Sequence, residues 1–131
     1  MKRSIFAFFI IFTVLIIIGC DNYGEEKYFN GTQLFYTSNV TEREADRLGQ
    51  FLIDWGFADG EYKTVQLNKT GNTYEFRMVV KTGIENDPVF RDVFRLATIE
   101  LSDGVFDGAN VDIHLCNDRL KTLSVVPMMR F

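Results

Sequence analysis

A fourteen-residue apolar run near the N-terminus, Ile5–Ile18, decides which part of this chain can fold as a water-soluble domain. The run contains a single threonine and follows two cationic residues, Lys2 and Arg3. A helix that crosses a bilayer needs about 20 apolar residues. A shorter run, with basic residues before it and the small Gly19 after it, is typical of the hydrophobic region of a secretory signal peptide. We therefore expect residues 1–19 to be a signal peptide that is removed.

The residue after this run is a cysteine, and Ile17-Ile18-Gly19-Cys20 resembles the lipobox of bacterial lipoproteins. The resemblance implies cleavage after Gly19, attachment of diacylglycerol to the Cys20 thiol, and acylation of the new amine with a fatty acid such as palmitate. Ile17 stands where the family usually has leucine, a change that keeps the position apolar. Two acyl chains suffice for stable anchoring, so the resemblance implies a lipid-anchored protein, exported from the cytoplasm to the bacterial cell envelope. The alternative is an uncleaved signal anchor with an incidental cysteine.

The mature chain would contain 112 residues, a usual size for one domain with one core. Loss of Lys2 and Arg3 moves its formal net charge from −4 to −6. An acidic domain is a poor match for nucleic acid, because binding there depends on neutralising phosphates with Lys and Arg. The same charge argues against the domain lying flat on an anionic membrane. With Cys20 lipidated, Cys116 is the remaining thiol, so no intramolecular disulfide is expected.

The mature chain divides into three parts. Residues 20–30 are polar and predict a lipidated N-terminus and flexible tether, and residues 31–127 predict a single domain. Within the domain, residues 33–38 favour a first strand. Thr41-Glu42-Arg43-Glu44 has the form of a capping box, and apolar residues at helical spacing follow it up to Trp55. We expect the first helix over residues 42–55 and a C-terminal tail over residues 128–131.

The rest of the domain predicts a hairpin, a second helix and a second hairpin. Residues 62–68 and 73–81 alternate as two strands around a polar turn. Asp87-Pro88 reads as the cap and first position of a helix that Asp103-Gly104 ends. Its expected apolar stripe is Phe90, Phe94, Ala97 and Leu101, supported by Val93. Residues 111–116 and 120–126 predict the last two strands, the second of which stops at Pro127.

The resulting order is β-α-β-β-α-β-β, which predicts an α+β, two-layer sandwich with both helices on one face of a mostly antiparallel sheet. The arrangement could be ferredoxin-like, or a duplicated αββ unit, since both halves run helix, aromatic-Asp-Gly turn and hairpin. Strand alternation directs one set of side chains to the helices: Phe76, Met78, Val80, Val111, Ile113 and Leu115. The opposite face would carry a mixed polar set, our candidate binding face: Gln66, Glu75, Arg77, Lys81, Asp112, His114 and Cys116.

Most of residues 31–127 also resemble an uncharacterised bacterial domain family. The resemblance lies in short pieces spread along the domain: Tyr36-Thr37, Val40-Thr41, Glu44-Ala45, Leu48-Gly49, Gly56-Phe57, Thr64-Val65-Gln66-Leu67, Tyr74-Glu75-Phe76-Arg77, Val105-Phe106 and His114-Leu115-Cys116. It implies no established activity, so it supports the fold and leaves the function open.

The reactive residues that the pattern brings closest are Asp112, His114 and Cys116, on one side of a strand. Residues two apart on a strand are separated by about 6.6–7 Å, whereas a base must come within about 2.6–3.2 Å of the proton donor. Zinc ligands lie about 2.0–2.3 Å from the ion, so one straight strand does not supply three of them. We therefore expect no catalytic residues, no metal and no cofactor.

These expectations favour a non-enzymatic, membrane-anchored module that binds another envelope protein through its open sheet face or sheet edge. The alternative is a lipoprotein that binds a small molecule or ion, either between sheet and helices or on the polar face around His114. A thiol-dependent enzyme that uses Cys116 ranks third.

Overall fold

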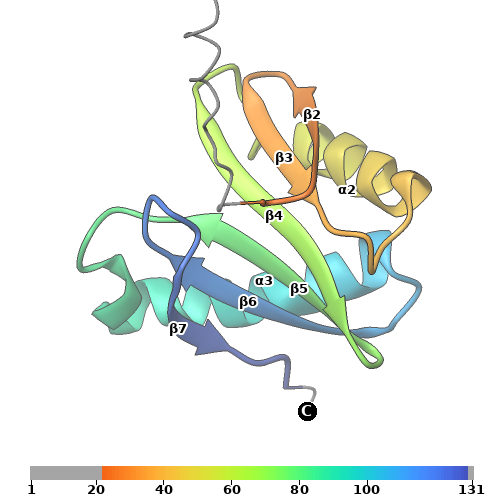
Figure 1. Ribbon diagram of the computed structural model, residues 1–131. Helices are drawn as coiled ribbons and strands as arrows, with labels where there is room; N and C mark the ends of the chain where they lie inside the picture. Colours follow the sequence, from red (N-terminus) through yellow and green to blue (C-terminus); the bar gives the residue numbers. More distant parts are fainter. Residues whose placement is uncertain (1–21, 130–131) are drawn as a thin grey trace, which may run out of the picture.

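The computed structural model describes residues 22–129, which form a six-stranded sheet with two helices on one face (Figure 1). The strands are β2 (Glu25–Phe29), β3 (Thr32–Tyr36), β4 (Lys63–Thr70), β5 (Thr73–Val79), β6 (Asn110–Cys116) and β7 (Thr122–Val126). The helices are α2 (Glu42–Trp55) and α3 (Pro88–Val105), and a 3-10 turn, η1 (Ile84–Asn86), precedes α3. Between residues 22 and 129, neither helix is long and apolar enough to cross a membrane.

The strands lie in the sheet in the same order as in the chain, β2-β3-β4-β5-β6-β7. Hairpins join the antiparallel pairs β2–β3, β4–β5 and β6–β7, whereas α2 and α3 connect the parallel pairs β3–β4 and β5–β6. The predicted α+β two-layer class is therefore confirmed, with a mixed sheet. A split βαβ unit would place another strand between the parallel partners. Here the partners are direct neighbours, which is the arrangement of consecutive αββ units.

Strand β2 corrects the prediction of a flexible tether over residues 20–30. Asn30 and Gly31 have φ angles of 47° and 89°, the left-handed values that a two-residue hairpin turn requires. The chain folds back at this turn, and the backbone of Glu25–Phe29 pairs with β3 along its whole length. The folded domain therefore begins before residue 31.

Side chains on the helix-facing side of β2 attach the strand to α2. Lys27 Nζ lies 2.8 Å from a Glu42 carboxylate oxygen and 2.6 Å from an Asp46 one. The Phe29 ring packs on Gly49, where a Cβ atom would stand 2.4 Å from the ring. These contacts compensate for the polar composition that favoured a tether.

Helix α2 begins with the predicted capping box and ends at the predicted glycine. The Thr41 side chain accepts from the Glu44 amide at 3.1 Å, and the Glu44 carboxylate accepts from the Thr41 amide at 2.8 Å. Gly56 has a φ of 90°, the left-handed conformation that commonly closes a helix. The buried side of α2, made by Ala45, Leu48 and Leu52, faces the sheet.

Helix α3 begins at Pro88 as predicted, with Asp87 accepting from the Val89 amide at 2.9 Å. It passes through Asp103-Gly104 and ends at Val105, so the predicted stop is wrong. Gly104 serves a packing role instead, because a Cβ atom there would lie 2.4 Å from the Phe51 ring of α2. The glycine lets the two helices approach each other.

The core lies between the helices and the covered face of the sheet. Four of the six predicted core residues on the central strands are buried: Phe76, Val111, Ile113 and Leu115. Met78 and Val80 are partly buried and pack against that cluster. Strand β5 ends at Val79, two residues earlier than predicted, so Lys81 lies in the connection that leads to η1.

Candidate functional site

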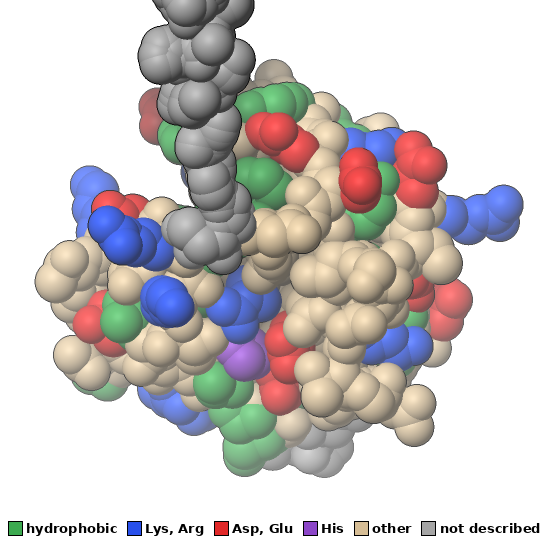
Figure 2. Space-filling view, viewed as in Figure 1, with side chains coloured by type: hydrophobic (Ala, Val, Ile, Leu, Met, Phe, Trp, Pro, Cys, Tyr) green, Lys and Arg blue, Asp and Glu red, His purple; other side chains and the backbone are tan. Residues whose placement is uncertain are grey.

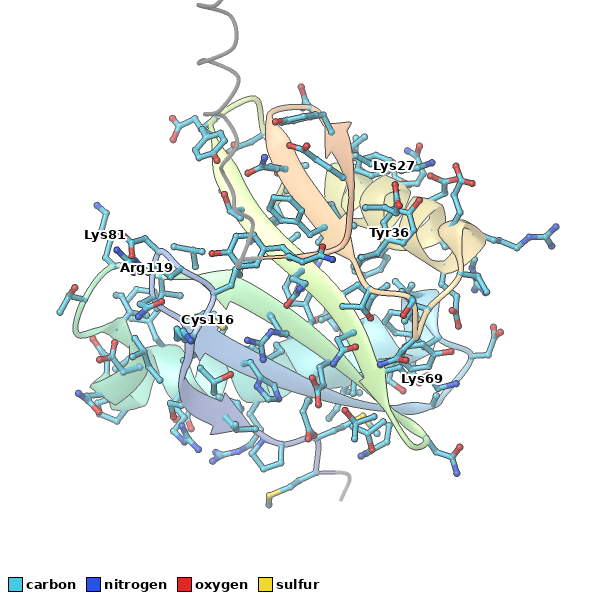
Figure 3. All side chains as sticks on the ribbon, viewed as in Figure 1. Lys27, Tyr36, Lys69, Lys81, Cys116 and Arg119 are labelled. Carbon is cyan, nitrogen blue, oxygen red and sulfur yellow. The ribbon has the colours of Figure 1, made fainter. Side chains whose placement is uncertain are left out.

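The predicted polar face exists, but not every predicted residue belongs to it. The strand register places Gln66 beside Arg77, Arg77 beside His114, and Glu75 beside Asp112. These residues lie on the face of the sheet without helices, which is turned toward the viewer in Figure 3. Cys116 ends β6 on the same face. Lys81, labelled in Figure 3, stands beyond the end of β5, and the predicted lipidation site, Cys20, lies outside the described residues.

Arg77 is the centre of a hydrogen-bond network on this face. Its Nε donates to the Gln66 side-chain oxygen at 2.8 Å, and one Nη donates to Thr122 Oγ1 at 2.9 Å. The other Nη donates to the backbone carbonyl of Leu120. The guanidinium therefore joins the middle of the sheet to the β6–β7 loop, and its donors are used within the protein.

The same network fixes the tautomer of His114, the chain's single histidine. Its Nδ1 lies 3.2 Å from an Arg77 Nη, which can only donate, and 3.0 Å from Thr122 Oγ1. Nδ1 is therefore an acceptor, and the proton of the neutral ring is on Nε2, 4.0 Å from a Glu75 oxygen. Burial lowers the pKa of His114, and the Glu75 carboxylate opposes that shift only in part.

The acid, imidazole and thiol of β6 do not form a relay. Cys116 is fully buried, and its Sγ contacts the backbone carbonyl of His114 at 3.6 Å. Burial raises the pKa of the Cys116 thiol, which favours the unreactive protonated form. The Asp112 carboxylate accepts from the Met128 amide at 3.3 Å instead. Among residues 22–129, no group of three His, Cys, Asp or Glu residues is placed to hold a metal ion.

Most polar side chains of this face are thus hydrogen-bonded to other groups of the domain. Asn68 and Thr70 donate to the two Glu75 oxygens at 3.0 and 2.9 Å, and Gln66 donates to the Tyr23 carbonyl at 2.8 Å. Figure 2 shows His114, in purple, partly covered and set between Lys or Arg and Asp or Glu side chains of this face. A ligand on this face would have to displace hydrogen bonds that the fold already makes.

An apolar groove lies on the opposite side of the sheet, where α3 passes the C-terminal end of α2. Its volume is about 310 Å³, and its floor includes the sheet residues Phe76 and Ile113. The walls come from the two helices and the segment after α2: Trp55, Phe57, Val93, Phe94, Leu96, Ala97 and Glu100. Most of this lining is apolar, as is common in binding sites for other molecules.

The groove continues onto an exposed apolar stripe of α3, formed by Val89, Val93 and Leu96. Their exposed fractions are 70%, 54% and 61%, and they recur at i, i+4 and i+7. At the opposite rim, Trp55 Nε1 donates to a Glu100 oxygen at 2.8 Å, while the Trp55 ring lies 5.2 Å from that of Phe51. The Trp55 indole therefore forms a wall of the groove while its N–H is hydrogen-bonded to Glu100.

Sequence reasoning missed this site because it assigned a single apolar stripe to the second helix. The predicted stripe, Phe90, Phe94, Ala97 and Leu101, only partly faces the core, since Phe90 is 43% exposed. A signal was present in Val89 and Leu96, which together with Val93 make a second stripe on the same helix. A helix that is apolar over more than one face usually has more than one partner.

Comparison with known proteins identifies the family of this chain. No match to this chain was found among curated proteins or among solved structures. Residues 28–127, from the end of β2 through β7, match the family AF_1994_N, described as a family N-terminal domain. The match covers most of the chain and nearly all of the sheet. The chain therefore belongs to the AF_1994_N family.

Proposed function

We propose that this protein is a lipid-anchored, non-enzymatic binding module of the bacterial cell envelope, which holds an apolar segment of another envelope protein. The observation that carries the proposal is the groove between α3 and the end of α2, together with the exposed stripe that extends it. Exposed apolar surface of this kind, bordered by polar residues, is typical of protein interaction sites.

The geometry of the stripe favours a helical segment as the occupant. Val89 and Leu96 are seven residues apart on α3, which corresponds to about 10 Å along the helix axis. An amphipathic helix inserts residues at i, i+3 or i+4, and i+7 into a groove of such length. We expect one larger apolar side chain of the partner to enter the groove beside Trp55, and smaller ones to cover Val89 and Val93.

The anchor in this proposal is the lipid on Cys20, which the lipobox resemblance implies. A diacylglycerol and an amide-linked acyl chain would keep the module on the membrane surface. The partner would then be another protein of the envelope, located close to the same membrane surface.

Two measurements test the binding site. A photo-crosslinking amino acid at Leu96, in cells, should capture a specific protein, and the matched position Arg43 on the exposed face of α2 should not. Leu96→Glu, with Arg43→Glu as control, should abolish co-purification of that protein without loss of fold, because surface substitutions usually change stability by less than about 0.5 kcal/mol. Equal capture from both positions, or retained binding by Leu96→Glu, would count against the groove.

The depth of the groove favours one second candidate, the binding of a small apolar molecule between sheet and helices. Phe76 and Ile113 at the floor would contact such a ligand. Trp55 is the single tryptophan of the chain, so its emission reports on the groove directly. Saturable change of that emission by an apolar small molecule, with no protein captured at Leu96, would favour this candidate over the proposed function.

A further inference from the structure

The chain enters the folded domain across the helix-free face of the sheet. The Tyr23 ring lies 5.3 Å from that of Phe35, and the Tyr23 carbonyl accepts from Gln66 at 2.8 Å. Gly24 passes so close to β3 that a Cβ atom would stand 2.2 Å from the Tyr36 carbonyl oxygen. Tyr23 and Gly24 are therefore held on this face by packing and hydrogen bonding.

This attachment leaves a short distance to the lipidation site. Cys20 is three residues before Tyr23, and three residues span at most about 11 Å when fully extended. The polar headgroup layer on each side of a bilayer is roughly 5–8 Å thick. With a lipid on Cys20, the domain would stay within this reach of the membrane, and the chain would leave the domain from the face that carries Tyr23.

Three cations lie at the rim of the same face, where β5 and β6 end. Lys81 follows β5, and Arg119 and Lys121 belong to the β6–β7 loop. All three are exposed, and none makes an ion pair among the described residues. Figure 3 shows Lys81 and Arg119 at the same end of the sheet, and Figure 2 shows several Lys and Arg side chains in this region, with some Asp and Glu side chains beside them. The acid of the loop, Asp118, leaves the group with a positive balance.

We propose that this face docks on anionic phospholipid headgroups through Lys81, Arg119 and Lys121. The inference rests on the lipid anchor of the proposed function and adds an orientation to it. Each basic residue close to an anionic bilayer shifts the balance toward the docked state by about fivefold at low salt. The net charge of the mature chain is negative, but the cations nearest the anchor determine which side meets the membrane, because salt screens the more distant charges.

In this orientation the helix layer points away from the bilayer. Arg77 and His114 alternate along β5 and β6 with Phe76 and Ile113, so the polar network and the groove are on opposite faces of the sheet. The groove would therefore be presented to the aqueous compartment, where a partner protein can reach it.

The test uses full-length lipidated protein in vesicles of phosphatidylglycerol and phosphatidylethanolamine. A fluorophore is attached through Arg119→Cys, which removes one of the three cations and leaves Lys81 and Lys121 to dock, or, as the control, through Leu96→Cys on the outer side of α3, while the native Cys116 is buried. A headgroup spin label should quench the fluorophore at position 119 strongly and that at position 96 little. Lys81→Gln with Lys121→Gln, or replacement of the lipids by phosphatidylcholine, should reduce quenching at position 119 toward the control value, to the residual level that the short connection alone produces.

Two failures are distinguishable. If mass spectrometry finds no lipid on Cys20 and the protein does not fractionate with membranes, the proposed anchor is wrong. If the lipid is present but position 96 is quenched as much as or more than position 119, the anchor stands and the docking orientation is overturned. Quenching at position 119 that ignores lipid charge and the Lys81 and Lys121 substitutions would also overturn the role of the cations.

Discussion

At the scale of single residues, the polar face shows that a half-buried charged side chain can be stabilised by hydrogen bonds to neutral groups, without a carboxylate partner. Arg77 has five N–H donors, and four contacts are made by them, to a side-chain amide, a hydroxyl, a carbonyl and a neutral imidazole. The cost of burying a charged group falls when its hydrogen bonds are made inside the protein. The network is therefore structural, and its histidine responds to pH through stability.

The first prediction concerns His114. Its folded-state pKa lies below the ordinary value of about 6.5, because the partly buried ring is favoured in its neutral form. The unfolded chain therefore binds the proton more readily, and the free energy of unfolding should fall as the pH drops below about 6.5, levelling off below the folded-state pKa. Urea denaturation between pH 7.5 and pH 5 should show this loss in the wild type.

The control for this prediction is His114→Gln, whose amide oxygen can still accept from Arg77 and which has no proton to gain. Its stability should change less over the same pH interval. The pH interval lies above the ordinary pKa values of carboxyl groups, so these groups contribute little to the change. Glu44 follows this rule, because burial raises its pKa but hydrogen bonds from Tyr74 and Thr41 outweigh burial and hold the pKa of Glu44 below the usual value. An equal loss in both proteins would assign the pH dependence to groups other than His114.

Strand alternation was sufficient to predict most residues of the polar face. Gln66, Glu75, Arg77 and His114 were assigned to it because side chains change face with a period of two. Alternation carries no information about what covers a face. Cys116 is buried beside Thr122 of β7, and Gln66 donates to the backbone of Tyr23, which lies 43 residues away in the chain. Contacts of that kind depend on tertiary structure.

At the scale of elements, local signals located both helices and missed one strand. The capping box at Thr41 and the Asp87-Pro88 start are chemical features of a few adjacent residues, so they can be read from sequence. Strand β2 has an equally local signal, the Asn30-Gly31 turn, with Tyr28-Phe29 before it and the strand-favouring Phe35-Tyr36 after it. Its polar composition hid it, since β2 is an edge strand whose outer side faces solvent.

The second prediction tests how β2 is attached to α2. Gly49→Ala would normally strengthen a helix by about 1 kcal/mol, but the new methyl group would stand 2.4 Å from the Phe29 ring. Overpacking costs about 1–3 kcal/mol, so we expect Gly49→Ala to destabilise the domain by about 1 kcal/mol in urea unfolding.

Replacing the ring should reverse this effect. In the Phe29→Leu background the smaller side chain leaves room for the methyl group, so Gly49→Ala should be neutral or stabilising there. A double-mutant cycle measures the coupling between the two positions. Equal effects of Gly49→Ala in both backgrounds would show that Phe29 does not hold β2 on the helix.

At the scale of the whole molecule, the positions of the segment before β2 and of the groove follow from the sheet order. Because each helix connects neighbouring strands and both helices cover one face, the other face is left for the N-terminal segment and the β6–β7 loop. The sequence predicted the two layers. It did not predict the groove, because the groove depends on how far the end of α2 stands from α3, a distance that Phe51 and Gly104 help to set.

The last prediction separates the two causes that would hold the domain at the membrane, the short connection and the three cations. Ten Gly/Ser residues inserted after Asp21 add a root-mean-square span of roughly 17–19 Å, while the domain and the lipidation motif are unchanged. On phosphatidylcholine vesicles, the fluorophore at position 119 should then lose any residual headgroup quenching, because neither the short connection nor charge attraction remains.

On vesicles with phosphatidylglycerol at low salt, quenching should persist, since Lys81 and Lys121 can still dock. The quenching should fall as added salt screens these two charges. If the insertion abolishes quenching on both kinds of vesicle, proximity alone orients the domain, and the cations have another role.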